Sequence, residues 1–180
     1  MKKIIAILIL SINLMGMTTK EGIISKSLSF EGKKLHGTSM RGIELSTLNA
    51  YNKLCGTNWK LNSLTHNQAV KILSKLFWND RLSYISNDKV AQFIFDWQMN
   101  TNPVTAYKLM HKSLGLKSQS TLSLELVAKI NENPKLALKK FYNARLSYLK
   151  SLKNWNKFKN GWTKRLNKLM EWFTLCIDKN

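Results

Sequence analysis

Two Asn-Pro steps constrain most strongly what this chain can fold into. They stand at Asn102-Pro103 and Asn133-Pro134. An asparagine side chain caps the first turn of a helix, and proline at the first helical position loses no hydrogen bond there. Each step therefore predicts the start of a helix. The first helix is expected to run to about Gly115, which suits a helix C-terminus, and the second through Leu152.

Other segments repeat the helical pattern. Thr65 to Gln68 reads as a capping box, and apolar residues follow it at three- and four-residue steps as far as Phe77. Residues 86–88 are a second start signal, before an apolar stripe that ends at Trp97. We also expect helices over residues 23–30, 125–130 and 161–177.

Strand alternation is missing from the sequence, and only Gly37 to Ile43 suits a short hairpin or an irregular loop. A chain of 180 residues has room for one domain with a sizeable core. We therefore predict a single all-α domain.

The charge of the chain is strongly positive, with a formal net charge of +19. Such a surface attracts polyanions, which include nucleic acid, anionic lipid and the acidic polymers of bacterial envelopes. No nucleic-acid-binding motif is recognised, so a nucleic-acid partner is not expected.

The first twenty residues resemble an export signal. Met1-Lys2-Lys3 is a short positive start, and Ile4 to Met17 is an apolar run too short to span a bilayer comfortably. We predict a signal peptide or an uncleaved signal anchor over residues 1–20, and a mature domain over 21–180 that is secreted, periplasmic or held at the membrane. A buried first helix or strand is the alternative.

The two cysteines do not indicate a metal site. Cys55 and Cys176 lack CxxC spacing and a histidine cluster, so no zinc site is predicted. We expect both to be free and buried, with a disulfide closing a long loop as the alternative.

Glu31 is the candidate catalytic residue. It is a lone carboxyl group at the expected end of an apolar helix, beside Phe30. The partial negative charge of a helix C-terminus and burial both favour a protonated carboxyl group, which can donate a proton near neutral pH. A general acid that cleaves a glycosidic bond needs this property. The alternative is a solvated surface residue.

Several motifs occur in one order along the chain. They are Phe30-Glu31-Gly32, Gly37-Thr38-Ser39-Met40-Arg41-Gly42-Ile43, Leu64-Thr65 with Phe77-Trp78, Phe95-Asp96-Trp97 with Asn100, Arg145-Leu146-Ser147-Tyr148, and residues 158–166. Their order and spacing resemble glycoside hydrolase family 108, the phage and bacterial N-acetylmuramidases with a lysozyme-like helical fold. The resemblance runs from about Ile24 to Trp172.

The resemblance implies a function and a site. Glu31 takes the place of the family's catalytic glutamate, and Ser39 that of a threonine in its Gly-x-Thr-x-x-Gly-Ile stretch. The implied reaction is hydrolysis of the β-1,4 bond between N-acetylmuramic acid and N-acetylglucosamine in peptidoglycan. The implied partners are glycan strands and anionic envelope polymers, with no metal or other cofactor. The alternative is a catalytically inactive peptidoglycan-binding relative.

The chain departs from the family pattern in two places. The segment that follows Glu31-Gly32 is shorter and lacks an aspartate, and its second glycine is Lys33. The usual Asp-Gly-x-x-Gly signature is replaced by residues 117–122. These departures are what make the inactive relative an alternative.

The candidate substrate-binding residues are Ser39, Arg41, Gly42, Asp96 and Trp97. The Ser39 hydroxyl and backbone groups of the loop are expected to position a water. Arg41 either holds a stem-peptide carboxylate or is exposed. Asp96 either contacts substrate or is a buried hydrogen-bonding hub, and Trp97 either stacks on a sugar or belongs to the core.

Two further charged residues bear on the site. Arg165 is expected to pair with a buried acid. Glu44 is expected to lie beyond the loop, so the sequence leaves open whether a second carboxyl group takes part.

Overall fold

The computed structural model describes residues 20–31 and 35–174. The predicted leader lies outside the described residues except for Lys20, and so does Cys176. The α-helices are α2 (Lys20–Leu28), α3 (Leu45–Cys55), α4 (His66–Leu76), α5 (Asp88–Met99), α6 (Pro103–Ser113), α7 (Leu124–Glu132), α8 (Pro134–Ser151) and α9 (Trp155–Thr174). Two short 3-10 helices, η1 (Leu61–Ser63) and η2 (Asp80–Tyr84), and three two-residue strands complete the elements.

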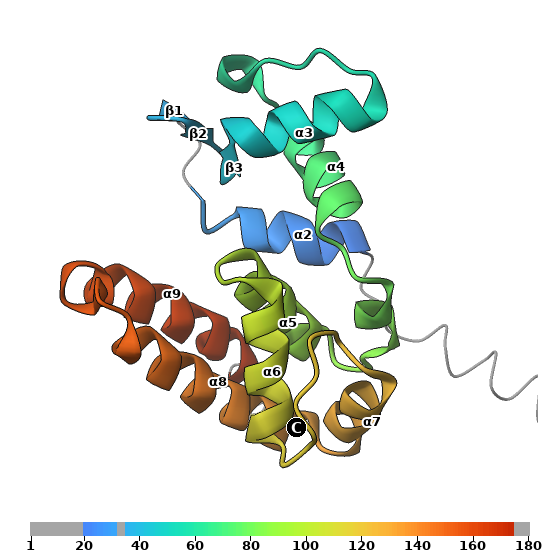
Figure 1. Cartoon of the computed structure of the whole chain (residues 1–180), viewed down its shortest axis with the longest axis vertical. Coiled ribbons are helices and arrows are strands. Elements are labelled where there is room, and N and C mark those ends of the chain that lie inside the picture. Colours follow the sequence, from blue (N-terminus) through green and yellow to red (C-terminus); the bar gives the residue numbers. More distant parts are fainter. Residues whose placement is uncertain (1–19, 32–34, 175–180) are drawn as a thin grey trace, which may run out of the picture.

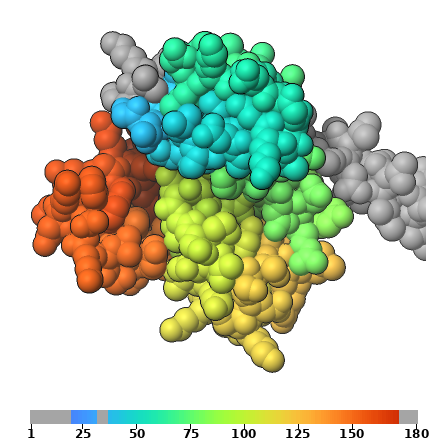
Figure 2. Space-filling view, turned by 45° about the horizontal axis from the view of Figure 1, so that its top comes forward, coloured from blue at the N-terminus to red at the C-terminus, as the bar shows by residue number. Residues whose placement is uncertain are grey.

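Helix α2 lies between two groups of elements (Figure 1). On one side are the small sheet, α3 and α4, and on the other are α5 to α9. Helix α2 packs against both α4 and α5, and α8 packs along α9. Figure 2 shows the sheet and α3 at one end of the molecule, with the α8–α9 pair projecting beside α5 and α6.

Helix α5 forms the centre of the core. All nine residues from Val90 to Gln98 are buried. Phe93, Phe95 and Trp97 are fully buried, and Phe141 of α8 packs on Trp97 with ring centroids 6.3 Å apart. Burial of each such side chain contributes roughly 1.5–3 kcal/mol before the entropy of ordering it is counted. The residues at the C-terminal end of α5 are therefore held on a rigid element.

The helix-start predictions are confirmed. Thr65 caps α4 in a capping box in which Gln68 is the reciprocal partner. Asn102 and Asn133 accept hydrogen bonds from the first turns of α6 and α8, each of which has proline at its start. These caps satisfy amide groups that have no partner within the helix.

Several helices differ from the prediction. Helix α3 was not predicted, because its N-cap residue Glu44 makes no side-chain capping bond and only Leu48 and Tyr51 are buried along it. Helix α9 begins six residues before Gly161, since Trp155 and Phe158 both pack on Trp162 across its first turns. Helix α2 ends at Leu28 rather than at residue 30.

The predicted hairpin is a three-stranded antiparallel sheet of β1 (Leu35–His36), β2 (Ser39–Met40) and β3 (Ile43–Glu44). Strand β2 pairs with β3 in the register Ser39 to Glu44 and Met40 to Ile43. The turn between them is Arg41-Gly42, and φ is positive at both residues (52° and 73°), as a type I′ turn requires. Together with the helices, this hairpin confirms an all-α, lysozyme-like fold with a short loop after α2.

The structure also bears on two other expectations, the burial of Cys55 and the presence of a membrane-spanning segment. Cys55 is a free thiol and is exposed, so the expectation that it is buried is wrong. It is the last residue of α3, directly before the C-cap residue Gly56. Within residues 20–31 and 35–174, the helices are too short or too polar for a membrane-crossing segment.

Candidate functional site

A cavity of about 270 Å³ lies where α2, the sheet, α5 and α9 meet. Glu31 is on its wall with 28% of its side chain exposed. The other lining residues are Ser27, Leu28, Ser39, Gly42, Glu44, Leu73, Phe95, Asp96, Met99, Asn100 and Arg165. The structure therefore brings four of the predicted site residues to one cavity: Glu31, Ser39, Gly42 and Asp96.

Glu31 is positioned by the end of α2 and by the hairpin. Its amide donates to the carbonyl oxygen of Leu28 at 3.0 Å, which turns the chain out of the helix. A Cβ atom on Gly42 would lie only 2.6 Å from Glu31 Cγ. Gly42 thus lets the hairpin backbone approach Glu31 more closely than any other residue would.

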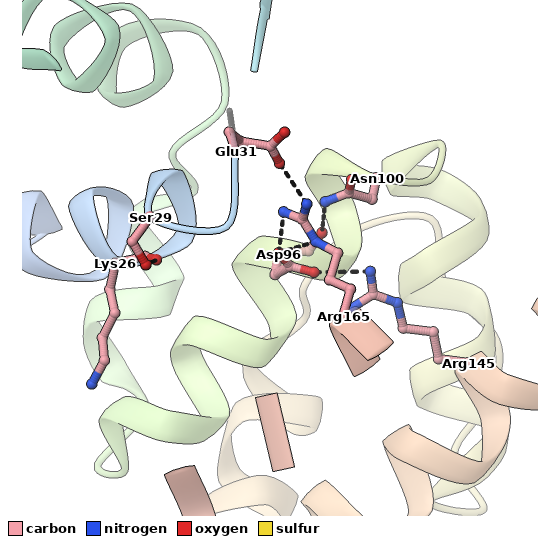
Figure 3. Close-up of polar contacts among 7 residues, drawn as sticks. All are labelled: Lys26, Ser29, Glu31, Asp96, Asn100, Arg145 and Arg165. Atoms are coloured by element: carbon pink, nitrogen blue, oxygen red, sulfur yellow. Dashed lines mark hydrogen bonds and ion pairs between the residues drawn. The ribbon is translucent and has the colours of Figure 1, made fainter. Parts of the chain in front are cut away.

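Arg165 joins Glu31 to Asp96 (Figure 3). Its Nη1 donates to Glu31 Oε1 at 2.5 Å, while Nε and Nη2 donate to Asp96 Oδ1 at 2.9 and 2.6 Å. The planar guanidinium group therefore holds both carboxyl groups in a fixed orientation. This pairing with a buried acid confirms the expectation for Arg165.

Asp96 is a buried hub of the site. Its side chain is fully buried, and Arg145 Nη2 lies 2.9 Å from Oδ2. This second contact is an ion pair without hydrogen-bond geometry, since Oδ2 has no hydrogen-bond donor among the described residues. Burial by itself would raise the pKa of Asp96, but the charges of Arg145 and Arg165 outweigh it and hold the pKa below its usual value. Asp96 is therefore ionised and fixed in place.

The pKa values of Arg145 and Arg165 shift in opposite directions. Burial lowers the pKa of Arg145 from its usual value, and Asp96 only partly offsets this effect. For Arg165 the attraction of Asp96 and Glu31 outweighs burial and raises the pKa. Both groups remain charged at neutral pH because an arginine pKa starts above 12.

Ser39 and Glu44 present their side chains to the cavity from neighbouring strands. The sequence placed Glu44 beyond the loop, and the structure corrects that expectation. The cause is the two-residue turn at Arg41-Gly42, which sets Glu44 directly opposite Ser39. The only signal of this arrangement in the sequence is the hairpin itself, because the register depends on the turn conformation.

Arg41 and Trp97 lie elsewhere. Arg41 Nε donates to the carbonyl oxygen of Leu64 at 2.9 Å, which ties the hairpin to the segment before α4. Trp97 is fully buried and packs edge-on against Phe93 at 6.0 Å, so it offers no exposed face to a sugar ring. In this structure Arg41 anchors the loop and Trp97 belongs to the core.

A second cavity of about 600 Å³ lies between α2, α3 and α4. His66 Nε2 and Ser25 Oγ are 2.8 Å apart at its wall, and Lys71 and Lys75 also line it. It is larger than the Glu31 cavity, and its one acidic lining residue, Glu21, is not paired with an arginine among the described residues. Within the described part of the chain, no cluster of three or more histidine, cysteine or acidic residues could hold a metal ion.

The fold is similar to that of a protein of known structure. The structure of Brucella abortus SagA superposes with a TM-score of 0.69, at 21% sequence identity, over 89% of this chain and 96% of that chain. At this identity the likeness shows the fold alone. No protein-family model and no curated protein matches the chain. The resemblance to glycoside hydrolase family 108 therefore stays a prediction.

Proposed function

We propose that this chain is an N-acetylmuramidase that cleaves peptidoglycan, with Glu31 as the general acid. The observation that carries the proposal is the position of Glu31. Its carboxyl group lies on the wall of a cavity, between Gly42 and Arg165, in a lysozyme-like fold. A general acid must be held within reach of the leaving oxygen, and contacts on two sides supply that orientation.

Within the proposal, Arg165 orients the Glu31 carboxyl group. Arg165 donates to Oε1 only, and Oε2 accepts from no residue that the structure describes. A protonated carboxyl group can carry its proton on Oε2 while Oε1 still accepts the bond from Arg165. When the proton passes to the glycosidic oxygen, Arg165 is already in place to bind the resulting carboxylate by a charge-assisted hydrogen bond.

The rest of the cavity suits a polar substrate. Ser39 and Asn100 line it, and the buried hydroxyl of Ser27 has no hydrogen-bond partner among the described residues. A glycan presents hydroxyl and amide groups that bind such partners. We propose that Ser39 holds the attacking water and that Gly42 contributes its backbone.

The charge and the first residues support a location in the cell envelope. We propose that residues 1–20 export the chain or anchor it at the membrane, so that it is secreted or periplasmic. The net charge of +19 would concentrate it on anionic envelope polymers. Both proposals rest on the sequence alone.

The proposal is tested by adding the purified chain to isolated cell walls and following turbidity. Glu31→Gln keeps the shape of the side chain but cannot donate an acidic proton. We expect the parent to clear the walls and Glu31→Gln to be at least 100-fold slower at an unchanged melting temperature. Glu21→Gln is the matched control, because Glu21 is a glutamate of α2, the helix that precedes Glu31, but lines the other cavity.

The outcomes separate the hypotheses. Equal clearing by the parent and by Glu31→Gln would exclude Glu31 as the acid. If the parent sediments with the walls but does not clear them, the chain is the inactive peptidoglycan-binding relative. Mass spectrometry of the soluble fragments identifies the cleaved bond, since a muramidase leaves N-acetylmuramic acid at the reducing end.

A further inference from the structure

We propose that Glu44 is the second carboxyl group of the site and takes the proton from the attacking water. This inference rests on the proposed hydrolysis. It gives the reaction a base from β3, a residue that the sequence had placed outside the site.

Glu44 lies on the face of the sheet that borders the cavity. Ser39 and Glu44 are directly paired across β2 and β3. Side chains of directly opposed residues lie on the same face of a sheet, with Cβ atoms about 5 Å apart. The neighbouring pair packs on the other face, where Ile43 is fully buried. Ser39 and Glu44 thus form a hydroxyl and carboxyl pair that lines the cavity.

The carboxyl groups on the cavity wall differ in their partners. The lining residues include three acids, Glu31, Asp96 and Glu44. Both oxygens of Asp96 are held by arginines, and Glu31 is bound by Arg165. Glu44 alone of the three is not paired with an arginine in the described structure, and a base must have an oxygen that is available to water.

The side chain of Glu44 is oriented by Thr38. Glu44 occupies the N-cap position of α3, yet its side chain caps no amide of that helix. Instead, the Thr38 hydroxyl donates to Glu44 Oε2 at 3.0 Å. One oxygen is therefore positioned by Thr38, and Oε1 has no donor among the described residues.

The hairpin sets the spacing between the two glutamates. Glu31 touches Gly42, and Glu44 stands two residues farther along the hairpin. Two extended residues advance the chain by roughly 6–7 Å. Enzymes that use water directly as the nucleophile hold their two carboxyl groups about 6.5–9.5 Å apart. The backbone advance from Gly42 to Glu44 is of this order, and the inference requires the two carboxyl groups to be separated by a similar distance.

The chemistry is a single displacement. Glu44 takes one proton from the water while the water oxygen forms a bond to the anomeric carbon. The bond from that carbon to the bridging oxygen breaks, and the bridging oxygen receives the proton of Glu31. The products are two shorter glycans, and the new reducing end has the inverted, α configuration.

The test uses the full chain and a soluble peptidoglycan oligosaccharide. We expect Glu44→Gln to lower kcat by about 10²- to 10⁴-fold with KM changed less than threefold. Azide is a nucleophile that needs no base, so it should restore turnover to Glu44→Ala and give an α-glycosyl azide. Azide should not restore Glu31→Gln, because protonation of the leaving group is still missing there. Glu21→Gln again serves as the control.

The results distinguish this inference from the proposed function. If Glu44→Gln keeps the kcat of the parent while Glu31→Gln is inactive, the role of Glu44 is refuted and the muramidase proposal stands. A β reducing end in the first product, read by proton NMR, would also refute a direct attack by water. A failure of azide to restore Glu44→Ala, when the variant melts like the parent, would indicate a structural role only.

Discussion

Gly42 lies against the side chain of Glu31, and a Cβ atom at that position would come within 2.6 Å of Glu31 Cγ and 3.0 Å of Cδ. The contact joins a turn of the hairpin to the residue that follows α2. The presence of glycine here therefore determines where the Glu31 carboxyl group is held.

Gly42→Ala should displace Glu31 and lower the rate of wall clearing by at least tenfold. The added methyl group cannot fit unless the Glu31 side chain or the hairpin shifts. The left-handed φ of 73° adds strain of about 1–2 kcal/mol for a residue with a side chain. Clearing is measured by turbidity, and stability by urea unfolding.

Gly37→Ala is the matched control for this variant. Gly37 also has a left-handed φ, 57°, but nothing lies within 4 Å of its missing Cβ. The control shares the backbone strain and lacks the collision. If both variants lose activity equally, strain in the hairpin explains the loss and the contact with Glu31 is unimportant.

Arg165→Lys should uncouple Glu31 from Asp96. Lysine keeps the positive charge but lacks the planar guanidinium group, whose N–H groups bind both carboxyl groups at once. We expect wall clearing to fall at least tenfold. Arg81→Lys is the comparison, because Arg81 makes a single hydrogen bond to a carbonyl oxygen, that of Leu122. A fully active Arg165→Lys variant would show that the orientation of Glu31 does not depend on the guanidinium group of Arg165.

Asp96→Asn should destabilise the protein by about 3–5 kcal/mol. Removal of the carboxylate leaves the guanidinium group of Arg145, only 4% exposed, without its counter-charge. The free energy of unfolding is measured in urea. The double variant Asp96→Asn with Arg145→Met should be more stable than Asp96→Asn alone, because it removes the unpaired charge as well. If Asp96→Asn alone is as stable as the parent, the ion pair between Asp96 and Arg145 does not contribute to stability as expected.

Some of these relationships could be predicted from the sequence, and others could not. The starts of α4, α6 and α8 depend on residues within one helical turn, such as Thr65, Asn102 and Asn133, so local patterns predict them. The position of Glu44 depends on the register of the hairpin, and a register is fixed by turn conformation and by the buried face together. Sequence spacing alone gives neither the turn conformation nor the buried face of the hairpin.

The contact between Glu31 and Arg165 illustrates the same limit. The two residues are 134 positions apart. The sequence predicted that Arg165 would meet a buried acid, and Asp96 is that acid. It did not predict that the same guanidinium group would also reach Glu31, because this depends on how α9 lies against α5 and the end of α2.

Asp96 should also make the stability of the protein depend on pH in the acidic range. Its pKa in the folded state lies below the value in the unfolded chain, which is about 3.9. The unfolded state therefore binds more protons between the two pKa values, and stability rises with pH there. The contribution is complete above the unfolded pKa and is lost as the pH falls through the folded pKa. Urea unfolding of the parent from pH 6 down to pH 2 measures the loss. Asp96→Asn should show a smaller decrease over the same range, and an identical decrease would mean that other carboxyl groups cause the acid sensitivity.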